Sequence, residues 1–153
     1  MNLSCRGRYA ARAMVELAVE AGQGPVPLSR IAEVQDLSRT YLQQLMGLLK
    51  RAGLVRVAQG FKGGFLLARP ASEITLADIL CAAEGAFSLV DCTADKQNCK
   101  RAPNCVMSDI WTEASTRLRD FFAGITLAEL AERQRRNLEE ACSGCDDARP
   151  DAV

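Results

Sequence analysis

The sequence predicts a mainly α-helical fold with one small β-hairpin, arranged as a winged helix-turn-helix followed by a long helix. Three amphipathic segments with helical spacing occupy the first third of the chain, and two short β-prone runs follow them around a glycine-rich tip. Helix, turn, helix and hairpin in this order are typical of a winged helix-turn-helix. In the second half, apolar residues recur every three or four positions, which predicts a long helix with a coiled-coil-like seam.

Three helices are expected before the hairpin. Apolar residues at helical spacing run through residues 3–21, and a Gly- and Pro-containing stretch then ends this first helix. Residues 28–34 form a short second helix. The third helix is expected to begin after an N-cap at Ser38 and to end at Gly53, where a left-handed C-cap residue is required.

The hairpin is expected from the runs 54–58 and 64–68, which flank the glycine-rich residues 59–63, and Pro70 ends it. In a winged helix-turn-helix, the helix before the hairpin enters the DNA major groove and the hairpin tip reaches an adjacent groove. The candidate DNA-binding residues are therefore Ser38, Arg39, Thr40, Tyr41, Gln43, Gln44, Arg56, Gln59 and Lys62. The alternative is a winged helix that contacts proteins instead.

The charge distribution favours double-stranded DNA as the partner. Residues 1–70 hold ten Lys or Arg against four Asp or Glu, whereas residues 71–153 hold nine against fifteen. The halves therefore carry +6 and −6 in a chain of zero net charge. A basic first half is the pattern expected of a surface that meets phosphates.

The composition predicts a globular protein of the cytoplasm with no membrane partner. Hydrophobic residues make up 48% of the 153 residues, which is enough to bury a core, and no apolar run approaches the ~20 residues that span a bilayer. Seven cysteines without a secretion signal indicate metal or redox chemistry rather than disulfides. The absence of histidine excludes His-dependent triads and HExxH zinc sites.

A polar loop over residues 91–105 carries three of these cysteines, Cys92, Cys99 and Cys105. Thiolates select zinc, copper(I) or iron-sulfur clusters. Their spacing does not match the C-x2-4-C pairs of structural zinc sites, which favours an iron-sulfur cluster. The alternative is three unrelated cysteines in a surface loop. A second pair, Cys142 and Cys145, is compatible with a ligand pair, a redox pair or an incidental occurrence.

The second half contains three further helices. Residues 75–78 form a variant capping box that opens a short helix ending at Gly85, and residues 126–129 form a full capping box for a last helix reaching about residue 141. Between them, the seam starts at Met107 and predicts a homodimer interface, the alternative being that it packs on the chain's own first helix. The candidate interface residues are Trp111, Ala114, Leu118, Phe121 and Ile125.

Several short motifs together resemble the bacterial IscR-type regulators, relatives of which include NsrR and CymR. The motifs lie at residues 7–14, 24–28, 41–45, 52–55, 63–67 and 124–127, and the likeness runs from Met1 to about Glu132. The resemblance implies a homodimeric winged-helix transcription regulator, not an enzyme, whose long helix crosses its partner. It also implies a 2Fe-2S or 4Fe-4S cluster held by a cysteine triplet, on which Cys92, Cys99 and Cys105 fall.

The sequence departs from this family pattern at the fourth cluster ligand and at two residues expected to read DNA. Ser108 stands where IscR has a histidine ligand, and Arg8 stands where NsrR-like proteins have an aspartate. The fourth ligand is therefore open among Ser108, Asp109, Cys142, Cys145 and Cys5 of the partner subunit. Gln43 replaces a glutamate of the recognition helix and Gln59 an arginine of the wing, so the family's promoter preference is not expected to apply.

The expected organisation is a DNA-binding domain over residues 1–70, a linking helix and cysteine loop over 71–106, a dimerisation helix and final helix over 107–141, and a flexible tail over 142–153. The expected function is transcription regulation in which an iron-sulfur cluster controls promoter affinity and senses iron, oxygen, nitric oxide or redox state. The alternatives are a cluster- or zinc-binding winged-helix protein used for protein contacts, and a cysteine-based redox protein.

Overall fold

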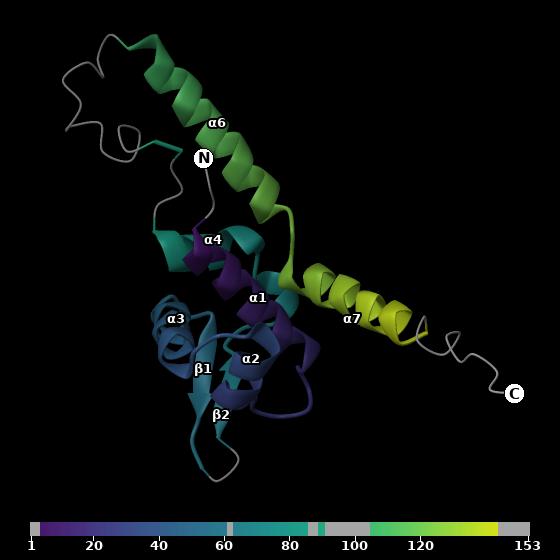
Figure 1. The fold of residues 1–153 in the computed structure, drawn as a ribbon. Helices are drawn as coiled ribbons and strands as arrows, with labels where there is room; N and C mark the ends of the chain where they lie inside the picture. The colour runs from purple at the N-terminus through teal and green to yellow at the C-terminus, as the bar shows by residue number, and fades with distance from the viewer. Residues whose placement is uncertain (1–3, 61–62, 86–88, 91–104, 144–153) are drawn as a thin grey trace, which may run out of the picture.

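The computed structural model describes residues 4–60, 63–85, 89–90 and 105–143, and these residues confirm the mainly helical winged helix-turn-helix fold (Figure 1). A helical body carries the hairpin at one end, and two long helices leave the body in different directions. In chain order, the elements are α1 (Cys5–Val19), α2 (Leu28–Gln35), α3 (Arg39–Arg51), β1 (Val55–Ala58), β2 (Gly64–Leu67), a 3-10 turn η1 (Ala71–Glu73), α4 (Leu76–Glu84), α6 (Val106–Ala123) and α7 (Leu127–Ser143).

The central helix of the body is α1, which packs against α4, α7, α2 and α3. Its buried stripe consists of small residues and two long apolar ones: Gly7, Ala10, Ala13, Met14, Leu17 and Ala18. Ser4 is the N-cap and accepts from the amides of Arg6 and Gly7 at 3.1 and 3.5 Å. At the other end, Arg135 of α7 donates to the carbonyls of Ala18 and Val19 in the last turn, where the helix has no i+4 amides to offer.

The turn between α2 and α3 uses local chemistry that fixes where α3 begins. Asp36 ends α2 in the left-handed conformation with φ of 51°. Ser38 then caps α3 by accepting from the amide of Tyr41 at 3.3 Å, as the sequence predicts. Gly53 has φ of +70° just beyond α3, which confirms the expected left-handed position. The buried face of α3 consists of Leu42, Leu45, Met46 and Leu49.

The wing is an antiparallel pair in which Val55 faces Leu67 and Ala58 faces Gly64. Val26, in the segment before α2, forms an antiparallel bridge to β2 through two 2.9 Å backbone hydrogen bonds with Phe65. Gly64 lies so close to the carbonyl of Val26 that any side chain would collide with backbone. The wing is therefore fixed to the helical body by backbone contacts.

The hydrophobic core continues past the wing into the second half of the chain. Ile74, Ile79, Leu127 and Ala131 belong to the same buried cluster as the apolar residues of α1, α2 and α3. The starts of α4 and α7 are joined by backbone hydrogen bonds of 2.9 Å (Leu76 N to Ile125 O) and 2.8 Å (Leu127 N to Ile74 O). Both predicted capping boxes, Thr75 with Asp78 and Thr126 with Glu129, form as expected.

One acidic residue of α1 is placed unfavourably, and this predicts a stabilising substitution. Burial and the neighbouring Glu20 raise the pKa of Glu16 above its usual 4.5, while Arg30 acts in the opposite direction. A raised pKa means that folding favours the neutral form, so the ionised carboxylate costs stability at neutral pH. We expect Glu16→Gln to raise the melting temperature at pH 7. The gain should shrink as pH falls through the raised pKa of Glu16 and be lost below 4.5, where the carboxyl is mainly neutral in both the folded and the unfolded state. Calorimetry at pH 7 and pH 4 tests this, and an equal gain at both would contradict it.

Candidate functional site

The exposed face of α3 carries most of the residues expected to read DNA. Arg39, Thr40, Gln43 and Gln44 are exposed along it, whereas Tyr41 is half-buried. The Tyr41 ring stands edge-on to Tyr9 of α1, with ring centroids 6.2 Å apart and planes at 87°. This contact fixes the ring against α1, as is typical of aromatic pairs.

A hollow of about 560 Å³ runs along this face of α3. Its lining consists of Arg6, Thr40, Tyr41, Gln43, Gln44, Leu45, Gly47, Leu48 and Arg51. The structure thus brings together Thr40, Tyr41, Gln43 and Gln44, and it adds two cations, Arg6 and Arg51, to the lining. Among these lining residues there is no carboxylate, so the hollow suits a negatively charged ligand with polar edges.

Arg6 and Arg51 were not among the residues expected from the sequence. Arg51 could have been found, because positions 40, 44, 47 and 51 share one face of a helix by their spacing of three and four residues. Arg6 could not, because it reaches the hollow from α1 and no pattern relates α1 to the surface of α3.

Gly47 lines the hollow, and replacing it with alanine is expected to raise stability while weakening DNA binding. An added Cβ would meet only Nη1 of Arg51 at 3.8 Å, which is an ordinary contact. Glycine inside a helix costs about 0.5–1 kcal/mol relative to alanine. We expect Gly47→Ala to raise the free energy of unfolding by about that amount in urea titrations, and to weaken DNA binding by narrowing the hollow. Lower stability would show that the glycine backbone is needed for the fold.

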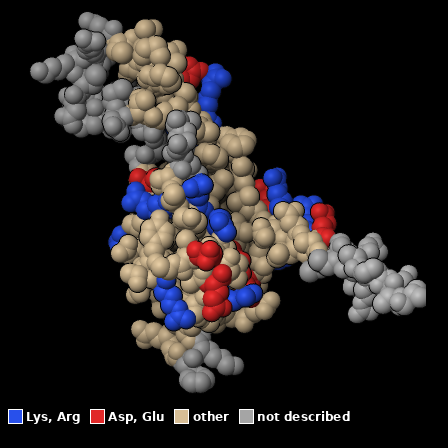
Figure 2. Space-filling model, viewed as in Figure 1, with Lys and Arg blue, Asp and Glu red and all other residues tan. Residues whose placement is uncertain are grey.

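Of the three wing residues expected to bind DNA, two lie in the described structure. Arg56 is exposed on β1, opposite Leu66, and Gln59 is exposed just after the strand. Lys62 lies outside the described residues. Figure 2 shows basic side chains at several places on the body, with acidic side chains gathered over α2 on the same face. Glu20, just after α1, pairs with Arg30 of α2 at 3.7 Å, so the basic first half is not uniformly positive.

Of the cysteine loop, the structure describes only Cys105, and Cys92 and Cys99 lie outside the described residues. Before the loop, the amide of Leu89 donates to Oγ of Ser115 in the middle of α6 at 3.1 Å. At its end, Cys105 is the half-buried N-cap residue of α6 and makes no side-chain capping bond. At 1.5 Å per residue, these two anchor points are ~15 Å apart along α6. The same helix thus bonds to Leu89 before the loop and begins directly after Cys105.

The candidate fourth ligands occupy different surroundings. Ser108 is buried, whereas Asp109 is exposed one residue further along α6. Cys5 is exposed in the first turn of α1, where Nη2 of Arg8 lies 3.1 Å from its sulfur. Cys142 lies in the last turn of α7, and Cys145 lies outside the described residues. Among the described residues, no three carboxylate or thiol side chains gather at one point as metal ligands would.

The apolar side of α6 faces away from the body. Ser108 and Ser115 are its buried residues, while Trp111 and Phe121 are 36% and 64% exposed. Ala114 and Leu118 are half-buried between these extremes. Ile125 lies beyond the end of α6, in the connection to α7, where its carbonyl accepts from the Leu76 amide.

No described helix is long and apolar enough to cross a membrane.

Known proteins match this chain over most of its length. The Rrf2 family model, described as an iron-dependent transcriptional regulator, matches residues 3–133. An HTH-type transcriptional regulator of Neisseria meningitidis is 40% identical over 134 residues, which cover 88% of this chain and 90% of that protein. The HTH-type transcriptional regulator IscR of Serratia proteamaculans is 38% identical over 134 residues, covering 88% of this chain and 81% of IscR.

Solved structures agree with the sequence matches. T. potens IscR has a TM-score of 0.72 with 33% identity and covers 88% of each chain. CymR, the global cysteine regulator of B. subtilis, has a TM-score of 0.71 with 32% identity, covering 87% of this chain and 98% of CymR. These findings confirm the likeness to IscR-type regulators and a role in transcription regulation rather than catalysis. This chain therefore belongs to the Rrf2 family of helix-turn-helix transcription regulators.

Proposed function

We propose that this protein is a homodimeric regulator that binds promoter DNA through α3 and the wing, with an affinity controlled by an iron-sulfur cluster on Cys92, Cys99 and Cys105. The observation that carries the DNA-binding part is the hollow along α3, which combines amide side chains with two arginines and no carboxylate. Glutamine pairs in a bidentate manner with adenine, and arginine pairs with guanine or phosphate. The hollow thus has the chemistry of base reading with phosphate contacts at its margins.

The cluster part is supported by the donor set and by the position of Cys105. Three thiolates from one loop suit iron, and a cluster bound by them carries negative charge. The positive end of the α6 dipole favours negative charge beside Cys105. The half-buried Cys105 makes no capping bond, so its sulfur is available as a ligand. When bound, such a cluster would supply redox chemistry or react with small signalling molecules.

The dimer part is supported by the exposed apolar face of α6. Among the described residues, the large exposed apolar side chains include Val106, Met107, Ile110, Trp111 and Phe121, all on this one helix. A contiguous apolar surface of this kind marks an interface in soluble proteins. A second copy of α6 is its occupant in the proposal, because the seam repeats at coiled-coil spacing and two DNA heads match two half-sites.

The same helix connects the proposed cluster to the proposed dimer. Because α6 bonds to Leu89 just before the cysteine loop, begins after Cys105 and carries the dimer face, a cluster bound by the loop also changes how α6 is held. The distance between the two α3 helices of the proposed dimer would then change as well. The resulting change in DNA affinity is bounded by the cluster's differential stability in the two arrangements, typically ~1–3 kcal/mol.

Selection from a library of random 30–40 base-pair duplexes with the full, anaerobically purified protein tests the DNA-binding part. We expect enrichment of a palindrome with half-sites ~34 Å apart, and an affinity that falls steeply with salt. Gln43→Ala and Gln44→Ala should each weaken binding to the selected site by about 1–3 kcal/mol and relax preference at one base pair. No enrichment and no salt dependence would mean that the winged helix serves protein contacts.

A further inference from the structure

Arg6 stands out because it is the one lining residue of the α3 hollow that comes from another element. It lines the hollow from the first turn of α1, with half of the side chain exposed. When a reading helix enters the major groove, the helices beside it lie against the DNA backbone. Arg6 is therefore placed where a phosphate, rather than a base, would lie.

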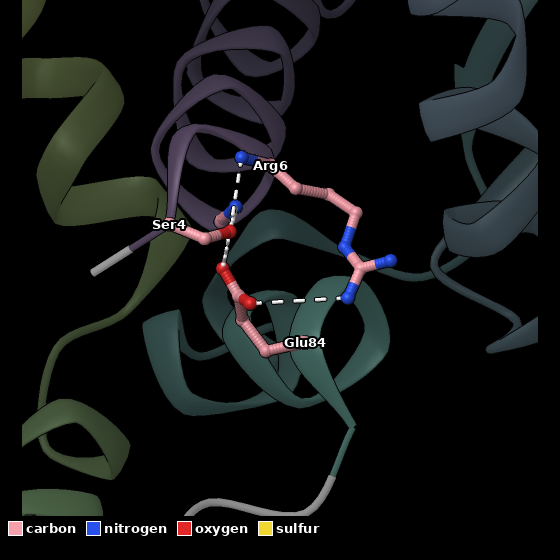
Figure 3. A network of polar contacts seen from close by, with 4 residues as sticks. Ser4, Arg6 and Glu84 are labelled. Carbon is pink, nitrogen blue, oxygen red and sulfur yellow. Dashed lines mark hydrogen bonds and ion pairs between the residues drawn. The ribbon is translucent and has the colours of Figure 1, made fainter. Parts of the chain in front are cut away.

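In the free protein, Glu84 at the end of α4 holds this arginine (Figure 3). Oε1 of Glu84 accepts from Oγ of Ser4 and, at 2.8 Å, from the amide of Gly7, whereas Oε2 lies 3.9 Å from Nη2 of Arg6. Gly7 permits this approach because any Cβ there would collide with Oε1. The carboxylate is thus fixed by α1 itself, and its pairing with Arg6 is the looser of its contacts.

The two partners of Arg6 differ in strength. An ion pair at 3.9 Å between side chains that are 49% and 24% exposed changes an equilibrium by about fivefold at most. A phosphate accepts two parallel hydrogen bonds from a guanidinium and carries its charge on several oxygens, so it is the better partner. DNA that reaches the margin of the hollow can therefore take the guanidinium from Glu84.

We propose that Arg6 binds a DNA phosphate beside α3, and that Glu84 pairs with Arg6 until the phosphate replaces Glu84 as its partner. This proposal rests on the proposed DNA binding. Arg6 then adds a phosphate contact from α1 to the contacts made by α3 and the wing. Glu84 is a competitor that sets how readily the contact forms, and it stays in place as the capping acceptor of α1 after Arg6 has moved.

The experiment measures fluorescence anisotropy of the full chain with a mixed-sequence 30 base-pair duplex and with a duplex selected from a random library, at several salt concentrations. Arg6→Gln should lower the slope of log affinity against log salt by about one for each bound head, and Arg6→Lys should keep the slope because it keeps the charge. Arg133→Gln, an exposed arginine of α7 outside the hollow, is the matched control and should change nothing.

Glu84→Gln removes the charge but keeps an acceptor for the Gly7 amide, so α1 remains capped. We expect it to tighten DNA binding by up to about fivefold in the native background and to have no such effect in the Arg6→Gln background. Thermal melts of each variant verify folding. An unchanged salt slope in Arg6→Gln, or equal tightening by Glu84→Gln in both backgrounds, would overturn the proposal while leaving DNA binding intact. If the native chain binds neither duplex, the proposed function itself fails.

Discussion

Replacing Cys92, Cys99 or Cys105 singly by alanine is expected to abolish the visible absorption of the anaerobically purified protein. Each thiolate supplies one ligand of the proposed cluster, and alanine offers no donor in its place. Promoter affinity should change at the same time, by up to ~1–3 kcal/mol relative to the holo-protein, since the cluster acts only through its differential stability. Absorption spectra and anisotropy with the selected duplex measure the two effects on the same samples.

Cys81 provides the control for this experiment. It is a half-buried free cysteine on α4, so Cys81→Ala should spare both the absorption and the affinity. The same spectra on Cys5, Cys142 and Cys145 variants, and on Ser108→Ala and Asp109→Asn, would locate the fourth ligand. If all three triplet variants keep an intact cluster, the assignment of the loop as the cluster site is wrong.

Phe121→Glu is expected to convert the proposed dimer into monomers. The Phe121 side chain is 64% exposed in the single chain, so the charge costs the isolated fold little. In the dimer, it would bury an unpaired carboxylate in an apolar interface, at a cost of several kcal/mol. The dimer dissociation constant should therefore rise by about a thousandfold or more, which sedimentation velocity measures. Monomers should also bind the selected palindrome weakly, because each engages only one half-site.

Thr116→Glu is the matched control for the dimer experiment. Thr116 is exposed on α6, and its hydroxyl donates to the carbonyl of Thr112 at 3.0 Å. Five residues before Phe121, it lies about 140° away around the helix axis, on a side that the seam does not use. It should leave the dimer intact while adding the same charge to the same helix. A Phe121→Glu variant that remains dimeric would place the interface elsewhere.

The sequence by itself determined the local features of this protein. The caps at Ser38, Thr75 and Thr126, and the left-handed Gly53, were predicted correctly because each depends on residues within three or four positions along the chain. The hairpin formed with bounds only one residue shorter at two of its ends than expected. Periodicity also placed Thr40, Gln43 and Gln44 on one face, since a helix brings positions three and four apart together.

Only the tertiary structure decided which distant residues share a surface. The bond between Glu84 and the Gly7 amide joins positions 77 residues apart, and Arg6 reaches α3 across the interface of two helices. The sequence left open whether the seam of α6 packs on α1 or faces outward, and the structure turns Trp111 and Phe121 outward because Ser108 and Ser115 occupy the buried side. Contacts of this kind depend on how the helices pack in three dimensions, and hydrophobic periodicity specifies a face of each helix without naming its partner.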